Sequence, residues 1–184
     1  TAGASGQHYA AAFGDGTTAS GQGSFAAGLS TTANNKAAAA FGEETVASGD
    51  HSVAFGQLSK ATGSRSAAFG YNTNASGSYS ATFGYYTTAG NYSAAFGYYT
   101  TAGTESVAFG DHTQATGYDS LAAGYRTTAS GAYSAAFGSY TNAIGYYSLA
   151  SGYDSYAYGD YSVAMGHGAR ATGYEAVAFS NSTA

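Results

Sequence analysis

The sequence predicts an all-β fold, a parallel β-roll (β-solenoid) of about thirteen 14-residue coils, and three observations predict it. First, an Ala-Phe-Gly motif or a close variant recurs every 14 residues, apart from two steps of 13. Second, small residues alternate with other residues inside each repeat, which is the period of a β-strand. Third, Gly, Ser, Thr, Asn and Tyr are abundant while only 8% of the residues are charged, which disfavours helices.

Each 14-residue repeat is a pair of heptads of the form x-x-(Ser/Thr)-x-Ala-x-Gly. This heptad has no apolar a/d seam and carries glycine, so it is not the heptad of a coiled coil. We expect one coil to hold two short strands and two turns. One glycine position, at the end of the repeat, is kept in all coils but the last: Gly14, Gly28, Gly42, Gly56, Gly70, Gly84, Gly97, Gly110, Gly124, Gly138, Gly152 and Gly166, with Ser180 in the last coil. A second position, seven residues later, holds glycine less regularly: Gly21, Gly49, Gly63, Gly77, Gly117, Gly131, Gly145, Gly159 and Gly173.

Inside each heptad, Ser/Thr, Ala and Gly share one face of the strand, because they occupy every second position. Two strands that face each other through such small side chains lie close together, so we expect a thin, flat roll with little interior volume. A threonine ladder on this face supports neighbouring coils along the stack. It comprises Thr73, Thr87, Thr100, Thr113, Thr127 and Thr141.

The outward faces of the two strands differ. Outward positions in one half of the repeat are mostly polar, as at Thr18, Ser20, Thr128 and Ser130, whereas two columns in the other half are apolar and contain all ten phenylalanines. The first column reads Phe13, Ala27, Phe41, Phe55, Phe69, Phe83, Phe96, Phe109, Ala123, Phe137, Ser151, Met165 and Phe179. The second reads Ala11, Phe25, Ala39, Val53, Ala67, Ala81, Ala94, Val107, Leu121, Ala135, Leu149, Val163 and Val177.

A stripe of phenylalanine along the outer face of one sheet must be buried against another surface. Burying each ring contributes roughly 1.5–3 kcal/mol, and soluble monomers rarely expose long apolar patches. Identical rolls that meet around a rotation axis are the simplest way to bury it; three rolls satisfy this condition, and so do two. The predicted core of the assembly is Phe13, Phe41, Phe55, Phe69, Phe83, Phe96, Phe109, Phe137, Met165 and Phe179.

The turns carry most of the 19 tyrosines, and consecutive coils place many of them in columns. Tyrosine is a common contact residue because it is large, rigid and able to form hydrogen bonds. These columns are therefore candidates for binding a protein or a glycan, although packing between coils or sealing of seams between subunits accounts for them as well. The candidates are Tyr71, Tyr79, Tyr85, Tyr86, Tyr92, Tyr98, Tyr99, Tyr133, Tyr147 and Tyr161.

Several classes of function find no support in the sequence. No Cys is present, and the four histidines fall in turns of different coils, so no converging metal-ligand or catalytic set is expected. The glycine pairs lack the Lys-Ser/Thr of a phosphate loop. The formal net charge is −5 without a basic run, which counts against nucleic acid, and no apolar stretch is long enough to span a membrane. We expect no enzyme activity, no cofactor and no direct membrane insertion by this segment. The histidines are His8, His51, His112 and His167.

The string Ser-Val-Ala-Phe-Gly at 52–56 and 106–110, followed by x-x-(Ser/Thr)-x-Ala-x-Gly, resembles the head repeat of YadA-like trimeric autotransporter adhesins. The likeness extends over the whole chain, residues 1–184. It implies a left-handed roll, a homotrimer on the outer surface of a Gram-negative bacterium, and attachment to host, matrix or cell-surface molecules. Phe stands here where the family usually has Ile.

One repeat domain over residues 1–184 is expected, as a head fragment of a longer fibre whose stalk and membrane anchor lie elsewhere. Two other functions remain open at this point. The rows Thr18/Ser20 and Thr128/Ser130 are loosely similar to the ordered face of an ice-binding solenoid, although Lys60 interrupts that face. A passive phage or bacterial fibre segment without its own ligand would carry the same repeats.

Overall fold

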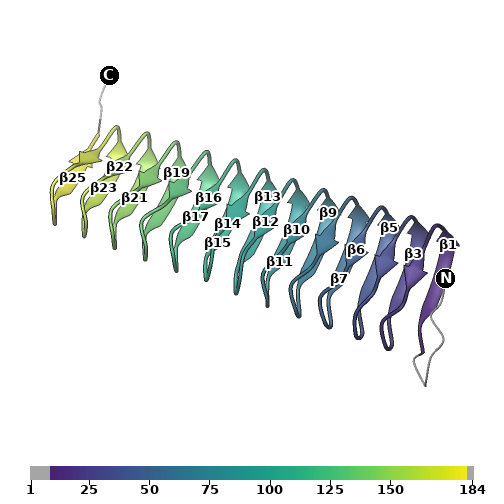
Figure 1. Cartoon of the computed structure of the whole chain (residues 1–184). Coiled ribbons are helices and arrows are strands. Elements are labelled where there is room, and N and C mark those ends of the chain that lie inside the picture. The colour runs from purple at the N-terminus through teal and green to yellow at the C-terminus, as the bar shows by residue number, and fades with distance from the viewer. Residues whose placement is uncertain (1–8, 182–184) are drawn as a thin grey trace. The chain divides into compact units, whose positions relative to one another are not determined.

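Each coil contributes one long and one short strand to a parallel β-roll. The computed structural model describes residues 9–181, which fall into two units, unit 1 up to Tyr92 and unit 2 from Ser93. Within each unit the long strands lie side by side in one sheet and the short strands in a second sheet, as Figure 1 shows. No helix occurs among the described residues. The predicted parallel β-solenoid is confirmed.

Unit 1 has the sheet orders β1-β3-β5-β7-β9-β11 and β2-β4-β6-β8-β10-β12. Its long strands are five residues each and its short strands two. The long strands are β1 (Ala11–Asp15), β3 (Phe25–Leu29), β5 (Ala39–Glu43), β7 (Val53–Gln57), β9 (Ala67–Tyr71) and β11 (Ala81–Tyr85). The short strands are β2 (Thr18–Ala19), β4 (Thr32–Ala33), β6 (Val46–Ala47), β8 (Lys60–Ala61), β10 (Asn74–Ala75) and β12 (Thr88–Ala89).

Unit 2 repeats this arrangement, with the sheet orders β13-β15-β17-β19-β21-β23-β25 and β14-β16-β18-β20-β22-β24. The long strands are β13 (Ala94–Tyr98), β15 (Val107–Asp111), β17 (Leu121–Tyr125), β19 (Ala135–Ser139), β21 (Leu149–Tyr153), β23 (Val163–His167) and β25 (Val177–Ser180). The short strands are β14 (Thr101–Ala102), β16 (Gln114–Ala115), β18 (Thr128–Ala129), β20 (Asn142–Ala143), β22 (Tyr156–Ala157) and β24 (Arg170–Ala171).

The strand register keeps each column of the sequence repeat in one row of the sheet. Phe41 pairs with Phe55, and Phe55 with Phe69. A 13-residue step preserves this register, since Phe96 still pairs with Phe109. The missing residue is taken from the turn between β14 and β15, which spans 103–106, whereas the turn between β16 and β17 spans 116–120. The shorter coils therefore tighten one turn.

The interior of the roll is built from alanine, serine and threonine. Ala68, Thr73 and Ala75 are fully buried, and the largest fully buried side chains among residues 9–181 are threonines and serines. The two sheets can approach closely only with such side chains. This confirms the thin roll and places the threonine ladder inside it.

The two halves of the coil are less alike than their heptads predict. The long strand continues one residue beyond the closing glycine, so Asp15, Glu43 and Tyr71 end strands instead of opening turns. The reason is visible at Gly70, whose φ of +133° redirects the chain while Tyr71 stays paired with Tyr85 in the next strand.

Every turn contains a residue in the left-handed conformation, and most of these residues are not glycine. Their φ values lie between 50° and 58°, for example 52° at Tyr147 and 55° at Arg65. The backbone N–H of Tyr147 donates to the Ala132 carbonyl of the adjoining coil at 3.0 Å, and other turns repeat this bond. The stacking of coils thus fixes a conformation that these side chains would not select alone.

The buried hydroxyl groups of the interior differ in whether they form hydrogen bonds, and this difference should affect stability. Thr127 is fully buried and its Oγ1 has no hydrogen-bond partner, whereas Ser155 Oγ donates to the Gly166 carbonyl at 2.8 Å. We expect Thr127→Val to leave the free energy of unfolding unchanged or slightly higher, because it removes an unsatisfied polar group. Ser155→Ala should lose about 1 kcal/mol. Urea unfolding followed by circular dichroism measures both, and a larger loss in Thr127→Val would contradict this account.

Candidate functional site

The outer face of the long-strand sheet is apolar and carries the predicted phenylalanine column. In unit 1 the rings of Phe41 and Phe55 stack at 4.3 Å, and that of Phe69 follows at 5.3 Å from Phe55. In unit 2 the rings of Phe96 and Phe109 stack at 5.0 Å. Phe109 is 44% exposed within the single chain. We call this surface the apolar face: in each unit it comprises the two apolar columns defined above.

Side-chain volume on the apolar face is balanced between its two columns. Where the first column holds the small Ala27, the second supplies Phe25, whose ring is tilted against Phe13 at 5.6 Å and stacks on Phe41 at 5.0 Å. The sequence prediction missed Phe25 as a member of the ladder. The same exchange recurs in unit 2, where Leu121 accompanies Ala123 and Leu149 accompanies Ser151. Side-chain size in one column is large where it is small in the other. This inverse relation is the sequence signal that identifies Phe25, Leu121 and Leu149 as replacements for a missing ring.

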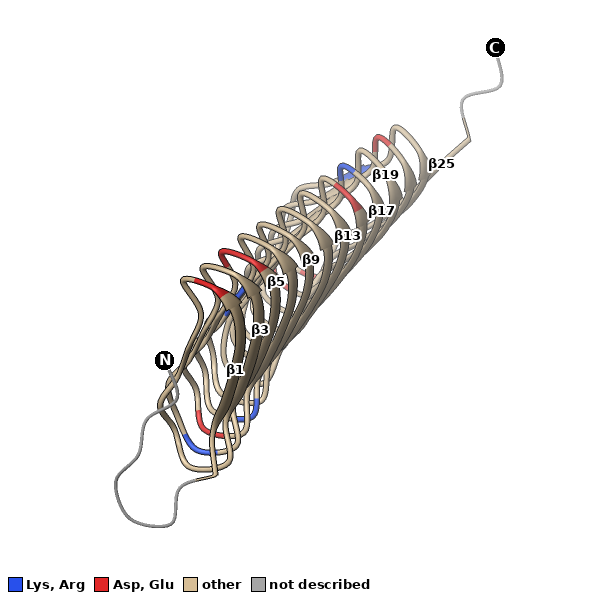
Figure 2. Cartoon of the chain, turned by 90° about the vertical axis from the view of Figure 1, so that its right-hand side faces the viewer, with Lys and Arg blue, Asp and Glu red and all other residues tan. Residues whose placement is uncertain are grey.

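Turns form two edges in each unit. Edge A consists of the turns that follow long strands, with the last residue of each strand, and edge B of the turns that precede long strands. Figure 2 shows that charged residues are concentrated on these turns. In unit 1, edge A is 15–17, 29–31, 43–45, 57–59, 71–73 and 85–87; edge B is 20–24, 34–38, 48–52, 62–66, 76–80 and 90–92. In unit 2, edge A is 98–100, 111–113, 125–127, 139–141, 153–155 and 167–169; edge B is 103–106, 116–120, 130–134, 144–148, 158–162 and 172–176.

Tyrosines of unit 1 stack at both edges. At edge A the rings of Tyr71 and Tyr85 lie 4.9 Å apart, and Tyr86 meets Tyr85 edge-on at 4.7 Å. At edge B the rings of Tyr79 and Tyr92 stack at 5.3 Å. The structure thus brings these candidate residues into contact, and their role in binding stays a prediction.

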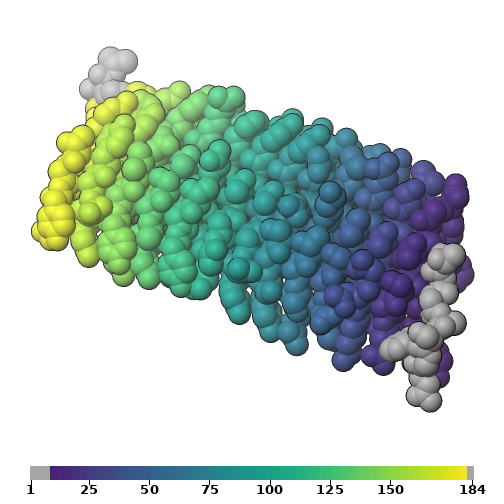
Figure 3. Space-filling model, in the orientation of Figure 1, coloured from purple at the N-terminus to yellow at the C-terminus, as the bar shows by residue number. Residues whose placement is uncertain are grey.

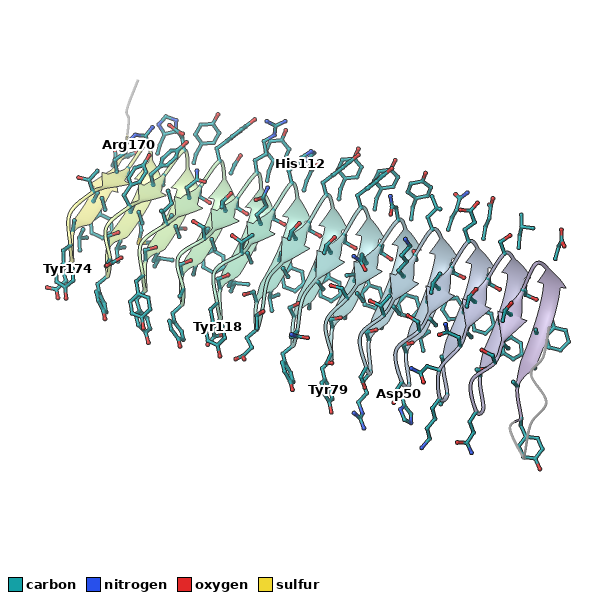
Figure 4. The ribbon with its side chains drawn as sticks, in the orientation of Figure 1. Asp50, Tyr79, His112, Tyr118, Arg170 and Tyr174 are labelled. Carbon is teal, nitrogen blue, oxygen red and sulfur yellow. The ribbon has the colours of Figure 1, made fainter. Side chains whose placement is uncertain are left out.

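A cluster of six tyrosines lies at edge B of unit 2. Tyr147 stacks on Tyr133 at 4.7 Å and on Tyr161 at 5.4 Å. Three further tyrosines meet this column edge-on, with Tyr146 only 4.4 Å from Tyr147. In Figure 4 the end members Tyr118 and Tyr174 point away from the ribbon on the side opposite His112 and Arg170. We call this cluster the acidic tyrosine edge; it comprises Tyr118, Tyr133, Tyr146, Tyr147, Tyr161 and Tyr174 with the acidic residues Glu105, Asp119, Asp160 and Glu175.

Sequence reasoning found the stacked column of this cluster and missed the rings beside it. Tyr118, Tyr146 and Tyr174 stand one position before the column, a spacing that a search for single columns overlooks. On edge A it also missed Tyr140, whose ring is 5.4 Å from Tyr125 and 5.9 Å from Tyr153. Figure 3 shows the side chains of successive coils as adjacent ridges on the face in view.

Carboxylates and phenols influence each other at the acidic tyrosine edge. A hydrogen bond to the Glu105 carboxylate raises the pKa of Tyr118 above its ordinary value. The nearby charge of Glu175 raises the pKa of Tyr174, and a hydrogen bond with Tyr147 raises the pKa of Tyr146. Tyrosine is protonated at neutral pH even at its ordinary pKa, and these upward shifts keep the phenols uncharged to higher pH.

Histidines take part in edge A of unit 2 more fully than solvated turn residues would. The ring of His112 stacks on Tyr99 at 5.1 Å, and its Nδ1 is hydrogen-bonded to Asp111. His167 stacks on Tyr153 at 5.1 Å. His51 lies in an exposed turn, and His8 is outside the described residues.

A comparison with family models gives a match over most of the chain. The model described as the YadA head domain repeat (2 copies) matches residues 33–59, 61–87, 102–127, 115–141, 143–169 and 157–179. The chain belongs to the YadA head domain repeat family. No match was found in a search of curated proteins.

In this YadA head repeat, the described residues offer few features of a catalytic or metal site. Residues 9–181 contain no group of three or more His, Cys, Asp or Glu side chains that could hold a metal ion. A shallow hollow of about 400 Å³ at the first described coil is lined by Tyr9, Ala10, Ala11, Gly23, Ser24 and Phe25, without a charged side chain. None of the described residues forms a helix that is long and apolar enough to cross a membrane.

Proposed function

We propose that this YadA head repeat is a segment of a homotrimeric, surface-displayed adhesin fibre. Its apolar face forms the trimer core, and its turns contact an extracellular protein or glycan. The chain acts by spacing and binding, without catalysis. The observation that carries the proposal is the stacked phenylalanine ladder, which runs over every coil of unit 1 and lies on the outside of the single chain.

Exposure of the apolar face supports burial against identical chains. Phe55, Phe83 and Phe109 remain more than a third exposed within one chain. An apolar stripe of this extent is rare on a soluble monomer. A closed arrangement about a rotation axis covers the stripe of every copy equally.

The volume balance supports a packed core more specifically. A face open to solvent would have no reason to pair Phe25 with Ala27, or Leu149 with Ser151. Closely packed surfaces do have that reason, because both voids and overpacking destabilise them. Membership of the YadA head family favours three chains over two. It also supports display at the outer membrane, through parts of the protein outside residues 1–184.

We favour a fibre segment over an ice-binding solenoid. The short-strand sheet is irregular, with Lys60, Gln114 and Arg170 exposed on it. A flat and regular row of threonines is therefore interrupted in both units. An ice-binding solenoid would also leave the apolar face unexplained.

The mass in solution tests the proposal. Light scattering coupled to size exclusion should give about three times 18.3 kDa for the chain. The trimer should also adhere to immobilised matrix protein or to cells above the level of a denatured sample. A soluble monomer would overturn the trimer. A trimer that adheres to nothing would reduce the chain to a passive fibre segment.

A further inference from the structure

The acidic tyrosine edge has an unusual charge composition. It carries Glu105, Asp119, Asp160 and Glu175, and edge B of unit 2 contains no Lys, Arg or His. Edge B of unit 1 differs, because Lys36 and Arg65 lie on it. The charged side chains on this edge are therefore all negative.

Acidic residues flank the stacked tyrosines within the same column. In the left-handed turn position, Asp119 precedes Tyr133 by one coil, and Glu175 follows Tyr161 by one coil. The rings between them are 38% to 47% exposed. Because the stacked rings cover each other's faces, a ligand lying along this column would contact ring edges and phenol hydroxyls in the middle and carboxylates at both ends.

Backbone hydrogen bonds hold the column in place before any ligand arrives. The N–H of Tyr133 donates to the Tyr118 carbonyl at 2.7 Å, and that of Tyr161 to the Tyr146 carbonyl at 2.7 Å. Asp160 accepts from the backbone N–H of Tyr146 at 2.8 Å. Such preorganisation lowers the entropy cost of binding.

The three arginines of the chain indicate which group fits this surface, because each places its guanidinium over a tyrosine ring. Arg65 lies 5.3 Å from the centroid of Tyr79, and Arg126 lies 5.5 Å from that of Tyr125. The third contact, described next, also includes a carboxylate. Cation–π attraction of this kind is a recognised source of binding energy.

Arg170 combines both features of the acidic tyrosine edge. Its guanidinium lies 4.2 Å from the centroid of Tyr156, and Nη2 donates to the Asp154 carboxylate at 3.2 Å. Its Nη1 also donates to the Asp154 backbone carbonyl at 3.1 Å, so a tyrosine face, a carboxylate and a carbonyl together hold this guanidinium. The acidic tyrosine edge also brings tyrosine rings and carboxylates together, and edge B of unit 2 has no arginine of its own.

We infer that the acidic tyrosine edge is a docking surface for a basic, arginine-rich, extended segment of another protein. The inference rests on the proposed function and deepens it, since it assigns a ligand class to one of the two edges. An uncharged glycan could stack on the same rings, but it would not use the surrounding negative charge. The net charge of −5 adds long-range attraction for a cationic partner.

The test uses fluorescence anisotropy of the assembled 184-residue chain with labelled synthetic peptides. The probes are an (Arg-Ser)4 peptide, a (Glu-Ser)4 peptide and a neutral hexasaccharide. The arginine peptide should bind, lose affinity as salt is raised, and bind more tightly than either other probe. If it does not bind, or binds no better than the acidic peptide, the inference is wrong.

Matched variants locate the contact. The triple variant Tyr133→Ser, Tyr147→Ser and Tyr161→Ser should weaken binding of the arginine peptide about ten-fold or more, since each guanidinium contact with a tyrosine ring or hydroxyl, of the kind Arg65 makes with the Tyr79 hydroxyl, is worth roughly two- to five-fold. The control is Tyr125→Ser, Tyr140→Ser and Tyr153→Ser on edge A of the same unit, which should change affinity less than about two-fold. Equal loss in both variants would overturn the assignment.

A charge variant tests the same surface without removing rings. Asp119→Asn with Glu175→Gln preserves side-chain size and should weaken arginine-peptide binding about three- to ten-fold, with a smaller dependence on salt. Unchanged binding would overturn the role of the carboxylates. If the tyrosine variant instead loses only the hexasaccharide, the edge is a glycan site and the inference falls.

The outcomes separate this inference from the proposed function. A trimer that adheres to cells yet ignores the arginine peptide rejects the inference alone. A monomer without adhesion rejects the proposed function. If the edge B variant loses the trimer while the edge A variant keeps it, the tyrosines seal a seam between subunits and the docking surface is wrong.

Discussion

Phe69→Asp is expected to separate the assembly into single chains. The Phe69 ring lies 5.3 Å from that of Phe55 and 4.8 Å from that of Phe83, in the middle of the ladder of unit 1. The substitution removes roughly 1.5–3 kcal/mol of apolar burial from each subunit. In the proposed trimer it also brings equivalent carboxylates close to one axis, where unpaired buried charge costs several kcal/mol more.

Light scattering measures the outcome directly, as a fall from about three times 18.3 kDa to one. Thermal unfolding should also move to lower temperature. The control is Asn74→Asp, which adds the same charge in the same coil, on the polar short-strand sheet. Asn74→Asp should remain assembled. If Phe69→Asp stays assembled and equally heat-resistant, the apolar face is not the core of a trimer.

Gly124→Ala is expected to destabilise unit 2 severely. An added Cβ would lie 1.8 Å from the Gly138 carbonyl oxygen of the adjoining strand, and φ is +136°. Both sheet spacing and backbone angle oppose the methyl group, and the strand cannot retreat without breaking its pairing with β19. We expect a loss of about 3 kcal/mol or more in the free energy of unfolding, from strain and overpacking together.

Gly168→Ala is the matched control, because it also places alanine at a positive φ. Here φ is +72° and no atom lies within 4 Å of the added Cβ. The equivalent turn position in the preceding coil is occupied by Asp154 at φ 52°. Gly168→Ala should therefore cost no more than about 1 kcal/mol. Urea midpoints compare the two, and equal losses would show that the close approach of coils is not what requires Gly124.

The fold could be predicted well from the sequence because each position of the 14-residue repeat holds the same kind of residue in successive coils. Gly70, Ala68 and Phe69 each represent one column, and their spacing was enough to assign the interior, the close approach of strands and the apolar face. Parallel pairing of identical repeats then leaves little choice of register, since a one-residue slip would exchange the faces of every strand.

The turns were predicted less well, for a physical reason. Residues such as Tyr147 and Arg65 have no preference for the left-handed conformation that they adopt. Their residue type therefore does not predict it. The extension of the long strand past Gly70 to Tyr71 was not predicted either, because glycine inside a strand usually indicates a weak point or an end. Contacts between neighbouring columns, such as Tyr146 with Tyr147, depend on that turn geometry and could not be predicted without it.

The left-handed turn positions also separate the scaffold from its surface chemistry. Leu58, Arg65, Asn72 and Asp119 all occupy the same backbone geometry, with φ between 50° and 58°. The stacked coils, rather than the side chain, determine that geometry. A library randomised only at these positions should therefore display new combinations of charge and aromatic rings at a constant pitch, while the frame beneath stays the same.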